Sequence, residues 1–252
     1  MTVFENLLSR PAGTSAGGPE AAVDLVAFPC AGSGSAGYRG WREALPANWR
    51  FTVACPPGRE VSYGQPFAKD MARLADDMAT ELRARRADGT GVPLVLFGHS
   101  MGGLLAQLVA QRIPADALVV AACPPPAGPA SLDDGRPLDH EQLRREVAAM
   151  LQAVSPMEPE LLAELVDLTA PVLAADVDLL ATYQAPANPL SCDIWALYGS
   201  DDTLEPLPWT AETTAAAHVR VLTGSHFFVQ ESPGTVVAEL RHCLAPIAGG
   251  PA

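Results

Sequence analysis

A serine that could act as a nucleophile stands in the segment Gly98-His99-Ser100-Met101-Gly102, which has the pattern G-x-S-x-G. The apolar run LVLF precedes this segment, and an apolar pattern with helical spacing follows it. In sites of this kind the serine sits on a strained turn between a strand and a helix, and the glycines permit close approach because they lack a Cβ atom. The sequence therefore predicts that Ser100 is a catalytic nucleophile.

A serine hydroxyl is a weak nucleophile, so it needs a general base that is itself oriented by a carboxylate. In this type of site the acid and then the histidine follow the serine along the chain. Asp201 and Asp202 follow the apolar run IWALY, and we favour Asp202 because a turn after Gly199 places the later residue toward the site. His226 follows the last apolar run, VRVL, in a Gly-Ser loop and is the predicted base. We interpret the other histidines as structural: His99, His140, His218 and His242.

An oxyanion intermediate needs two backbone N–H donors near the serine. The N–H of Met101, directly after Ser100, is the first candidate. The second is expected in the loop after the first central strand, FPCAGSGS, where we select the N–H of Ala31 because glycines at 32 and 34 allow close approach.

Short apolar runs separated by helical patterns must position these residues. Most runs lack polar alternation, which is typical of strands that are covered on both faces in a parallel sheet. Strands alternating with helices predict an α/β fold with a mostly parallel central sheet flanked by helices. The predicted strands are LVAF (25–28), FTVAC (51–55), LVLF (94–97), ALVVAAC (117–123), IWALY (194–198) and VRVL (219–222).

One segment, 124–188, interrupts the alternation with helical patterns that are separated by prolines. Asp139 and Gln142 resemble a capping box that begins the first of its helices. We interpret this insertion as a helical lid over the site, although helices that merely cover the sheet are the alternative. Residues 1–20 are expected to form a loose N-terminal arm on a single domain that spans 1–252.

Composition excludes several other classes of protein. The chain has 252 residues and a formal net charge of −13, which disfavours nucleic acid and anionic membranes as partners. No apolar stretch is long enough to span a membrane and no signal peptide is evident, so we expect a cytoplasmic protein. Five scattered cysteines show no metal-binding spacing, which indicates free thiols, no metal and no cofactor.

The motifs together resemble the type II thioesterases of polyketide and non-ribosomal peptide pathways, over about residues 25–244. The blocks that carry the resemblance are FPCAGSGSAGYRGW, PPGRE, LFGHSMGG, YGSDD and GSHFF, in this order. The resemblance implies an α/β-hydrolase fold and a stand-alone hydrolase that clears stalled or aberrant acyl groups from the phosphopantetheine arm of carrier proteins. By position, it implies a Ser100–His226–Asp202 triad with Ala31 and Met101 as the oxyanion hole, and a partner that is an acyl or peptidyl carrier protein. We expect a monomer.

The chain departs from the family pattern in the loops near the site. Cys30 replaces a usual histidine, which leaves the oxyanion hole intact but introduces a thiol that could be oxidised. Ser62 and Gln65-Pro66 replace the arginine and Glu-Pro that usually follow PGRE, which puts a salt bridge anchored in this loop in doubt.

The carrier proteins on which this family acts are typically acidic, so long-range attraction to this acidic chain cannot drive docking. A local basic patch of Arg39, Arg42 and Arg59 or an apolar groove beneath the lid is expected to do so. A general carboxylesterase or lipase with the same triad remains an alternative, as does a non-catalytic acyl-binding protein. A cyclising terminal thioesterase is disfavoured, since the chain starts at Met1 with no carrier domain before it.

Overall fold

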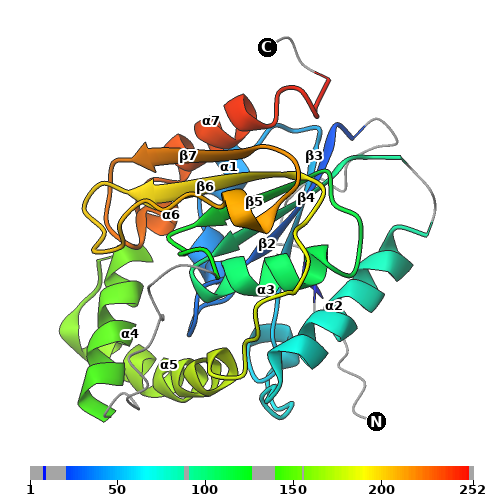
Figure 1. Cartoon of the computed structure of the whole chain (residues 1–252). Helices are drawn as coiled ribbons and strands as arrows, with labels where there is room; N and C mark the ends of the chain where they lie inside the picture. Colours follow the sequence, from blue (N-terminus) through cyan, green and yellow to red (C-terminus); the bar gives the residue numbers. More distant parts are fainter. Residues whose placement is uncertain (1–7, 10–20, 88–90, 127–139, 155, 250–252) are drawn as a thin grey trace.

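The computed structural model describes residues 8–9, 21–87, 91–126, 140–154 and 156–249. Within these ranges seven strands form one sheet in the order β1-β3-β2-β4-β5-β6-β7 (Figure 1). All neighbouring strands run parallel except β1, which pairs antiparallel with β3. The strands are β1 (Leu8–Ser9), β2 (Val23–Phe28), β3 (Trp49–Ala54), β4 (Leu94–His99), β5 (Ala117–Ala121), β6 (Asp193–Gly199) and β7 (Ala217–Leu222).

This sheet confirms the predicted α/β fold and all six predicted strands. β1 was not predicted, and it falls in the segment 1–20 that the sequence led us to expect as a loose arm. In β1, Leu8 pairs with Ala54 of β3 and Ser9 pairs with Val53. The rest of the arm lies outside the described residues.

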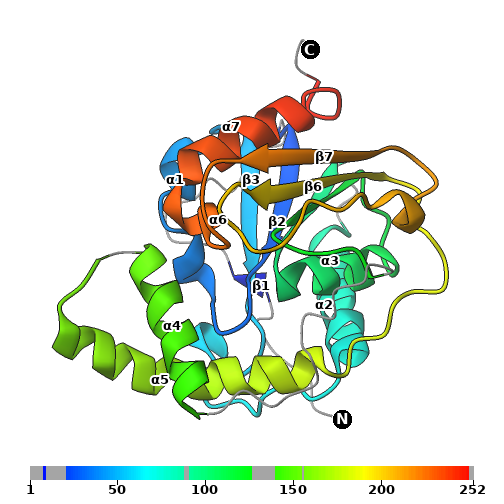
Figure 2. The same cartoon turned by 60° about the vertical axis from the view of Figure 1, so that its left-hand side comes forward.

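Both faces of the central strands β2, β4 and β5 are buried, which explains why these strands read as continuous apolar runs. On β2, Val26 and Phe28 belong to a core shared with α2 (Met71–Arg85) and α3 (Met101–Ala110). Leu25 and Ala27 face the opposite core, to which α7 (Pro233–Cys243) contributes. Figure 2 shows α2 and α3 on one side of the sheet and the short α1 (Trp41–Ala44) with α7 on the other.

Two helices, α4 (His140–Val154) and α5 (Pro159–Leu180), lie side by side at one end of the molecule, in the segment predicted to be a lid (Figures 1 and 2). They share a small apolar core of their own, made by Val147, Val166, Ala170 and Leu173. Asp139, the predicted cap of the first helix, lies outside the described residues.

Prolines separate the helices of this segment less often than the sequence suggested. Pro159 occupies the first turn of α5, where its missing N–H is tolerated. Pro171, however, lies inside α5, and the helix continues through it to Leu180. The expectation that prolines separate the helical patterns is therefore wrong at Pro171, where the neighbouring Ala170 and Leu173 pack in the α4–α5 core.

The parallel strands bring the predicted site residues to one edge of the sheet. Ala31, Ser100, Asp202 and His226 follow β2, β4, β6 and β7 respectively, each directly or within a few residues of the strand end. Because the carboxyl ends of parallel strands meet at the same edge, this topology gathers four loops that are distant in sequence. No helix in the described part of the chain is long and apolar enough to cross a membrane.

Candidate active site

Ser100 stands on a sharp turn between β4 and α3. Its backbone has φ 54° and ψ −122°, in a region that non-glycine residues rarely occupy. The turn is held by hydrogen bonds from the Ser100 N–H to the Ala121 carbonyl (2.8 Å) and from the Gly103 N–H to the Ser100 carbonyl (2.8 Å). Such strain persists only where the surrounding structure imposes it, and it is concentrated at active sites.

Two glycines around Ser100 are required by close backbone approach. A Cβ atom on Gly98 would collide with backbone atoms of Gly102 and Gly103. A Cβ atom on Gly102 would collide with the carbonyl oxygens of Phe28 and Pro29. The glycines therefore close the turn itself and bring the start of α3 against the loop that follows β2.

Asp202 and His226 meet in the structure, in a contact between the loops after β6 and β7. Nδ1 of His226 donates to Oδ2 of Asp202 over 2.9 Å, and the aspartate side chain is 1% exposed. This donation leaves the lone pair of the neutral imidazole on Nε2, which is the arrangement that a general base requires. Burial raises the pKa of Asp202, but its hydrogen bond with His226, the attraction to that ring when it is protonated, and hydrogen bonds from the backbone of Leu204 and Thr203 together more than offset this effect. The pKa of Asp202 therefore lies below its ordinary value.

Backbone contacts bring these two loops into register. The Ser200 N–H donates to the Leu222 carbonyl (2.8 Å) and the Asp201 N–H to the Gly224 carbonyl (2.9 Å). A Cβ atom on Gly199 would collide with the carbonyl oxygens of Ser225 and Gly224, so the crossing requires glycine there. The adjacent Asp201 is exposed, and its carboxylate accepts from the Ser200 hydroxyl at 3.1 Å; it lines the same cavity as His226, but it is Asp202 that bonds the His226 ring.

His99 has a connecting role that the sequence did not reveal. Its Nε2 lies 2.8 Å from the carbonyl oxygen of His226, and its Nδ1 lies 3.3 Å from the amide nitrogen of Gln230. A carbonyl only accepts, so Nε2 carries the proton and Nδ1 accepts from Gln230. Burial and, to a smaller extent, the positive charge that His226 can carry together lower the pKa of His99 to about 3. His99 is therefore neutral, and it ties the turn of Ser100 to the loop of His226.

The two predicted oxyanion donors lie at adjoining segments. Met101 begins α3, and Ala31 lies in the loop after β2 that Gly102 approaches. Within the described ranges, neither the Ala31 nor the Met101 N–H donates to another protein atom. Both donors are thus available to a ligand at the site.

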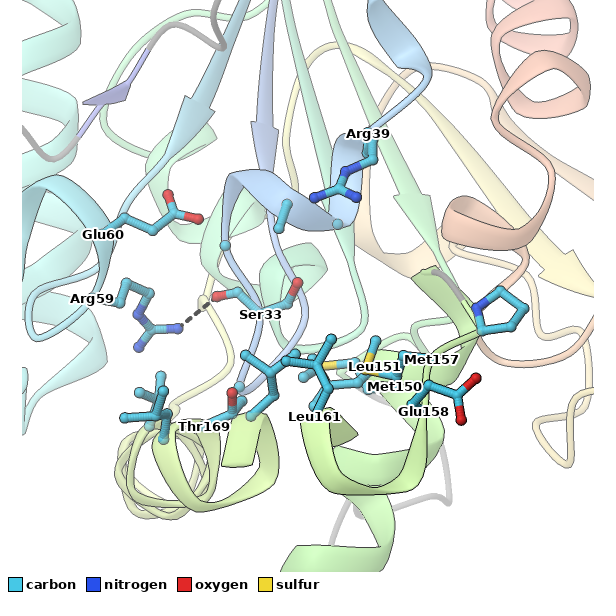
Figure 3. Close-up of a pocket in the computed structure, with 18 residues that line it drawn as sticks. Ser33, Arg39, Arg59, Glu60, Met150, Leu151, Met157, Glu158, Leu161 and Thr169 are labelled. Carbon is cyan, nitrogen blue, oxygen red and sulfur yellow. Dashed lines mark hydrogen bonds between the residues drawn. The ribbon is translucent and has the colours of Figure 1, made fainter. Parts of the chain in front are cut away.

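A buried ion pair joins this loop to helix α5. Arg59 donates to both carboxylate oxygens of Asp176, over 2.7 and 2.5 Å, and to the Ser33 carbonyl over 2.9 Å (Figure 3 draws the Arg59–Ser33 bond). The Gly32 N–H donates to the same carboxylate over 2.8 Å. The departures after PGRE therefore do not remove the salt bridge of this loop, which is anchored by Arg59 itself. Because Arg59 is 6% exposed and paired, its predicted part in a basic docking patch is wrong.

The environment of Cys30 also differs from the one expected for an oxidisable thiol. Cys30 is 4% exposed, and burial raises its pKa to about 12. The expectation that this thiol is oxidisable is therefore wrong, since the reactive form is an accessible thiolate. All five cysteines of the chain are free, as predicted.

A cavity of about 650 Å³ lies between helices α4 and α5 and the loop after β2 (Figure 3). One wall is Gly32, Ser33 and Gly34 with the Arg59–Glu60 segment, and the other is largely apolar. The apolar lining comes from α4, α5 and the link between them: Met150, Leu151, Met157, Leu161, Leu165, Leu168 and Val172.

A second cavity, of about 550 Å³, opens at the acid–base pair itself. Asp202, Ser225 and His226 line one side of it, and Ala149 and Gln152 of α4 line the other. Since Met150 and Leu151 face the first cavity, α4 forms the wall between the two spaces.

Sequence reasoning missed two polar residues that shape the site, Asp176 and Gln230. Asp176 is a single acid on an otherwise apolar face of α5, where an unpaired carboxylate would be costly. That pattern indicates a buried partner, although the partner's identity depends on a contact that spans 117 residues. Gln230 gives no such signal in its sequence context.

A serine on a strained strand–turn–helix turn, with an acid–base pair at the same edge of a mostly parallel sheet, defines an α/β-hydrolase. Within that class the chain belongs to the Thioesterase domain family, whose match covers residues 23–244. The chain is accordingly a thioester hydrolase by family and fold.

Individual relatives are similar over most of this chain. It is 29% identical over 253 residues to a probable cadicidin biosynthesis thioesterase of Streptomyces griseus, covering 92% of this chain and 65% of that protein. It is 29% identical over 237 residues to thioesterase TesA of Mycobacterium marinum, covering 87% of this chain and 90% of the relative. The solved structure of BorB, a type II thioesterase from the borrelidin biosynthetic cluster, superposes with a TM-score of 0.78 at 26% identity, over 96% and 99% of the two chains.

Proposed function

We propose that this protein is an editing thioesterase that hydrolyses stalled or aberrant acyl groups from the phosphopantetheine arm of carrier proteins. The 2.9 Å contact between Asp202 and His226, at the same sheet edge as the strained Ser100, is the observation that carries the proposal. Relatives named for polyketide and peptide pathways support the choice of substrate. The cytoplasmic location and the monomeric state expected from the sequence stay predictions.

The proposed mechanism has two steps with Ser100 as nucleophile. Oγ of Ser100 attacks the thioester carbonyl while its proton passes to Nε2 of His226, and the oxyanion accepts from the Ala31 and Met101 N–H groups. Collapse breaks the C–S bond, and His226 protonates the departing thiolate of the carrier arm. Water then attacks the acyl-serine ester, loses its proton to His226, and releases the free acid and the Ser100 hydroxyl.

The two cavities suggest where the parts of the substrate lie. The apolar cavity beneath α4 and α5 adjoins Gly32, next to the proposed donor Ala31, and suits the acyl chain. The more open cavity at Asp202 and His226 suits the polar pantetheine arm and the water that completes hydrolysis. We therefore interpret α4 and α5 as a lid that divides these two routes.

The test compares one acyl group on a phosphopantetheinylated carrier protein and as a simple oxygen ester, with the Ser100→Ala variant as the blank. We expect faster turnover on the carrier thioester, and a loss of the order of 10⁶ in Ser100→Ala, as when a triad that acts as a unit loses its nucleophile. Faster turnover of the free ester would instead make the protein a general esterase. More than a tenth of wild-type turnover in Ser100→Ala would overturn the assignment of the nucleophile.

A further inference from the structure

The loop that carries Ala31 is held by a carboxylate from the lid. Asp176, on α5, is 2% exposed and accepts from the Gly32 N–H through Oδ2 over 2.8 Å. Arg59 spans both oxygens of this carboxylate and also donates to the Ser33 carbonyl. Lid helix, PGRE segment and oxyanion loop thus meet at one buried ion pair, which no step of hydrolysis uses directly.

The hydrogen bond to Gly32 fixes the conformation of a tight turn. The Ser33 N–H donates to the Cys30 carbonyl over 3.1 Å, which makes Ala31 and Gly32 the central residues of a β-turn. Gly32 has φ +74°, the value typical of the third residue of a type II turn. Types I and II differ by a flip of the peptide between the central residues, here the Ala31–Gly32 peptide. Asp176 holds that peptide in the type II orientation because it accepts from its N–H.

Rotation of the Ala31–Gly32 peptide would disturb the Ala31 N–H, the oxyanion donor that precedes it in the chain. Ala31 is the residue about which the flip occurs, and it packs against the core shared by α4 and α5. A catalytic donor displaced by about 1 Å can cost about 100-fold in rate. The orientation of the Ala31 N–H therefore depends on the acceptor that α5 supplies.

The negative charge of the Asp176 carboxylate explains why it is paired with Arg59. An isolated carboxylate near an oxyanion hole would oppose the negative charge that develops there. Arg59 compensates this charge with two hydrogen bonds of 2.7 and 2.5 Å to the carboxylate. The pair thus supplies a firm acceptor for Gly32 without a net negative charge beside the reacting carbonyl.

We propose that Asp176 is a positioning residue of the oxyanion hole, which sets the Ala31 N–H through Gly32 while Arg59 neutralises its charge. This assignment rests on the proposed function, because it takes the Ala31 N–H as an oxyanion donor. It also implies that α5 belongs to the fixed part of the site, so that any opening of the lid involves α4.

The experiment measures kcat and KM on a short-chain p-nitrophenyl ester, with the active sites counted by a fluorophosphonate that labels Ser100. In Asp176→Leu we expect kcat per labelled site to fall about 10- to 100-fold with little change in KM. Asp176→Asn keeps an oxygen that can accept from Gly32, so it should retain activity within about 5-fold of wild type. The double variant Arg59→Met with Asp176→Leu replaces the ion pair by apolar side chains, an exchange that buried pairs often tolerate, and should be as slow as Asp176→Leu.

A trifluoromethyl ketone of the same acyl chain separates positioning from mere support of the fold. Its adduct with Ser100 carries an oxyanion, so its inhibition constant should rise in Asp176→Leu by about the factor that kcat/KM loses. A purely structural role would lower the melting temperature and the labelled fraction but leave kcat per labelled site unchanged, and that result in the double variant would overturn the proposal. Since the substrate is a small ester, failure to act on carrier thioesters would contradict the proposed function alone.

Discussion

At the scale of single residues, two neighbouring carboxylates show how environment assigns a role. The Asp202 side chain is 1% exposed and contacts Nδ1 of His226, whereas Asp201 is exposed and accepts from Ser200. The Asp202 Oδ1 also accepts from the Leu204 N–H over 3.1 Å, which fixes the carboxylate from its other side. We infer that only Asp202 can orient the base.

Asp202→Asn is expected to lower kcat by roughly 10⁴, since an amide no longer selects the imidazole tautomer that accepts on Nε2. Asp201→Asn is the matched control, and it should stay within about 3-fold of wild type because surface substitutions have small effects. Both values come from steady-state hydrolysis of the same thioester. A larger loss in Asp201→Asn than in Asp202→Asn would show that the wrong acid has been assigned.

His99 predicts how stability changes with pH. Its pKa is about 3 in the folded protein against 6.5 ordinarily, so the unfolded chain binds more protons between these values. The contribution of neutral His99 to the free energy of unfolding should therefore be fully present above pH 6.5, and it should be lost as the pH falls below that value. Urea unfolding at a series of pH values should show a flatter decline from pH 6.5 to about 5 in His99→Gln, which keeps a donor for the His226 carbonyl. Identical slopes in the two proteins would contradict this account.

At the scale of elements, the β4–α3 turn and the loop after β2 act as one unit. Gly102 lies so close to Phe28 and Pro29 that α3 begins against the backbone of that loop. The strained Ser100 and the proposed donor Ala31 are therefore positioned by the same contact.

Gly102→Ala should separate these two elements, because the new methyl group would meet backbone carbonyls that have no freedom to rotate away. We expect kcat to fall at least about 100-fold, in line with the loss of one oxyanion donor. Gly103→Ala is the control, since its methyl group would crowd the Cys123 side chain, at 2.8 Å from the sulfur, and would meet the Gly98 carbonyl oxygen only at the ordinary contact distance of 3.5 Å. Equal kcat values for the two variants would argue against the contact as the positioning element.

At the scale of the whole molecule, the net charge of −13 limits how an acidic carrier protein can approach. Of the three arginines considered for docking, Arg59 is committed to Asp176, while Arg39 and Arg42 are exposed. Arg39 also lines the large cavity (Figure 3). The exposed apolar side chains nearby, Leu161 and Leu168, belong to α5 and line the same cavity.

Hydrolysis of the acyl group from an acylated carrier protein should accordingly become faster as salt is added at low ionic strength. Salt screens the repulsion between two acidic proteins beyond a Debye length of about 10 Å at 0.1 M, while local contacts persist. The measurement is kcat/KM against ionic strength, with an uncharged small ester as the control that should not respond. A steep fall in kcat/KM between low and moderate salt would indicate steering by attraction instead.

The central fold was predictable because its signals are local. A buried parallel strand requires an unbroken apolar run, and all six runs became strands. The residues at the strand ends followed from the same pattern, so Ser100, Asp202 and His226 could be named before their contacts were known. Pro171 shows the limit of local signals, because tertiary packing keeps α5 continuous where propensity predicts a break.

The sequence alone determined the fold class and the types of residue at the edge of the sheet, since periodicity and glycine placement act over a few residues. Only the tertiary structure decided the partners of the buried charges. Asp176 meets Gly32 across 144 residues and Arg59 across 117, and such contacts depend on where α5 packs against the loops at the sheet edge. A buried charge must find a partner, but which partner it finds is set by three-dimensional packing.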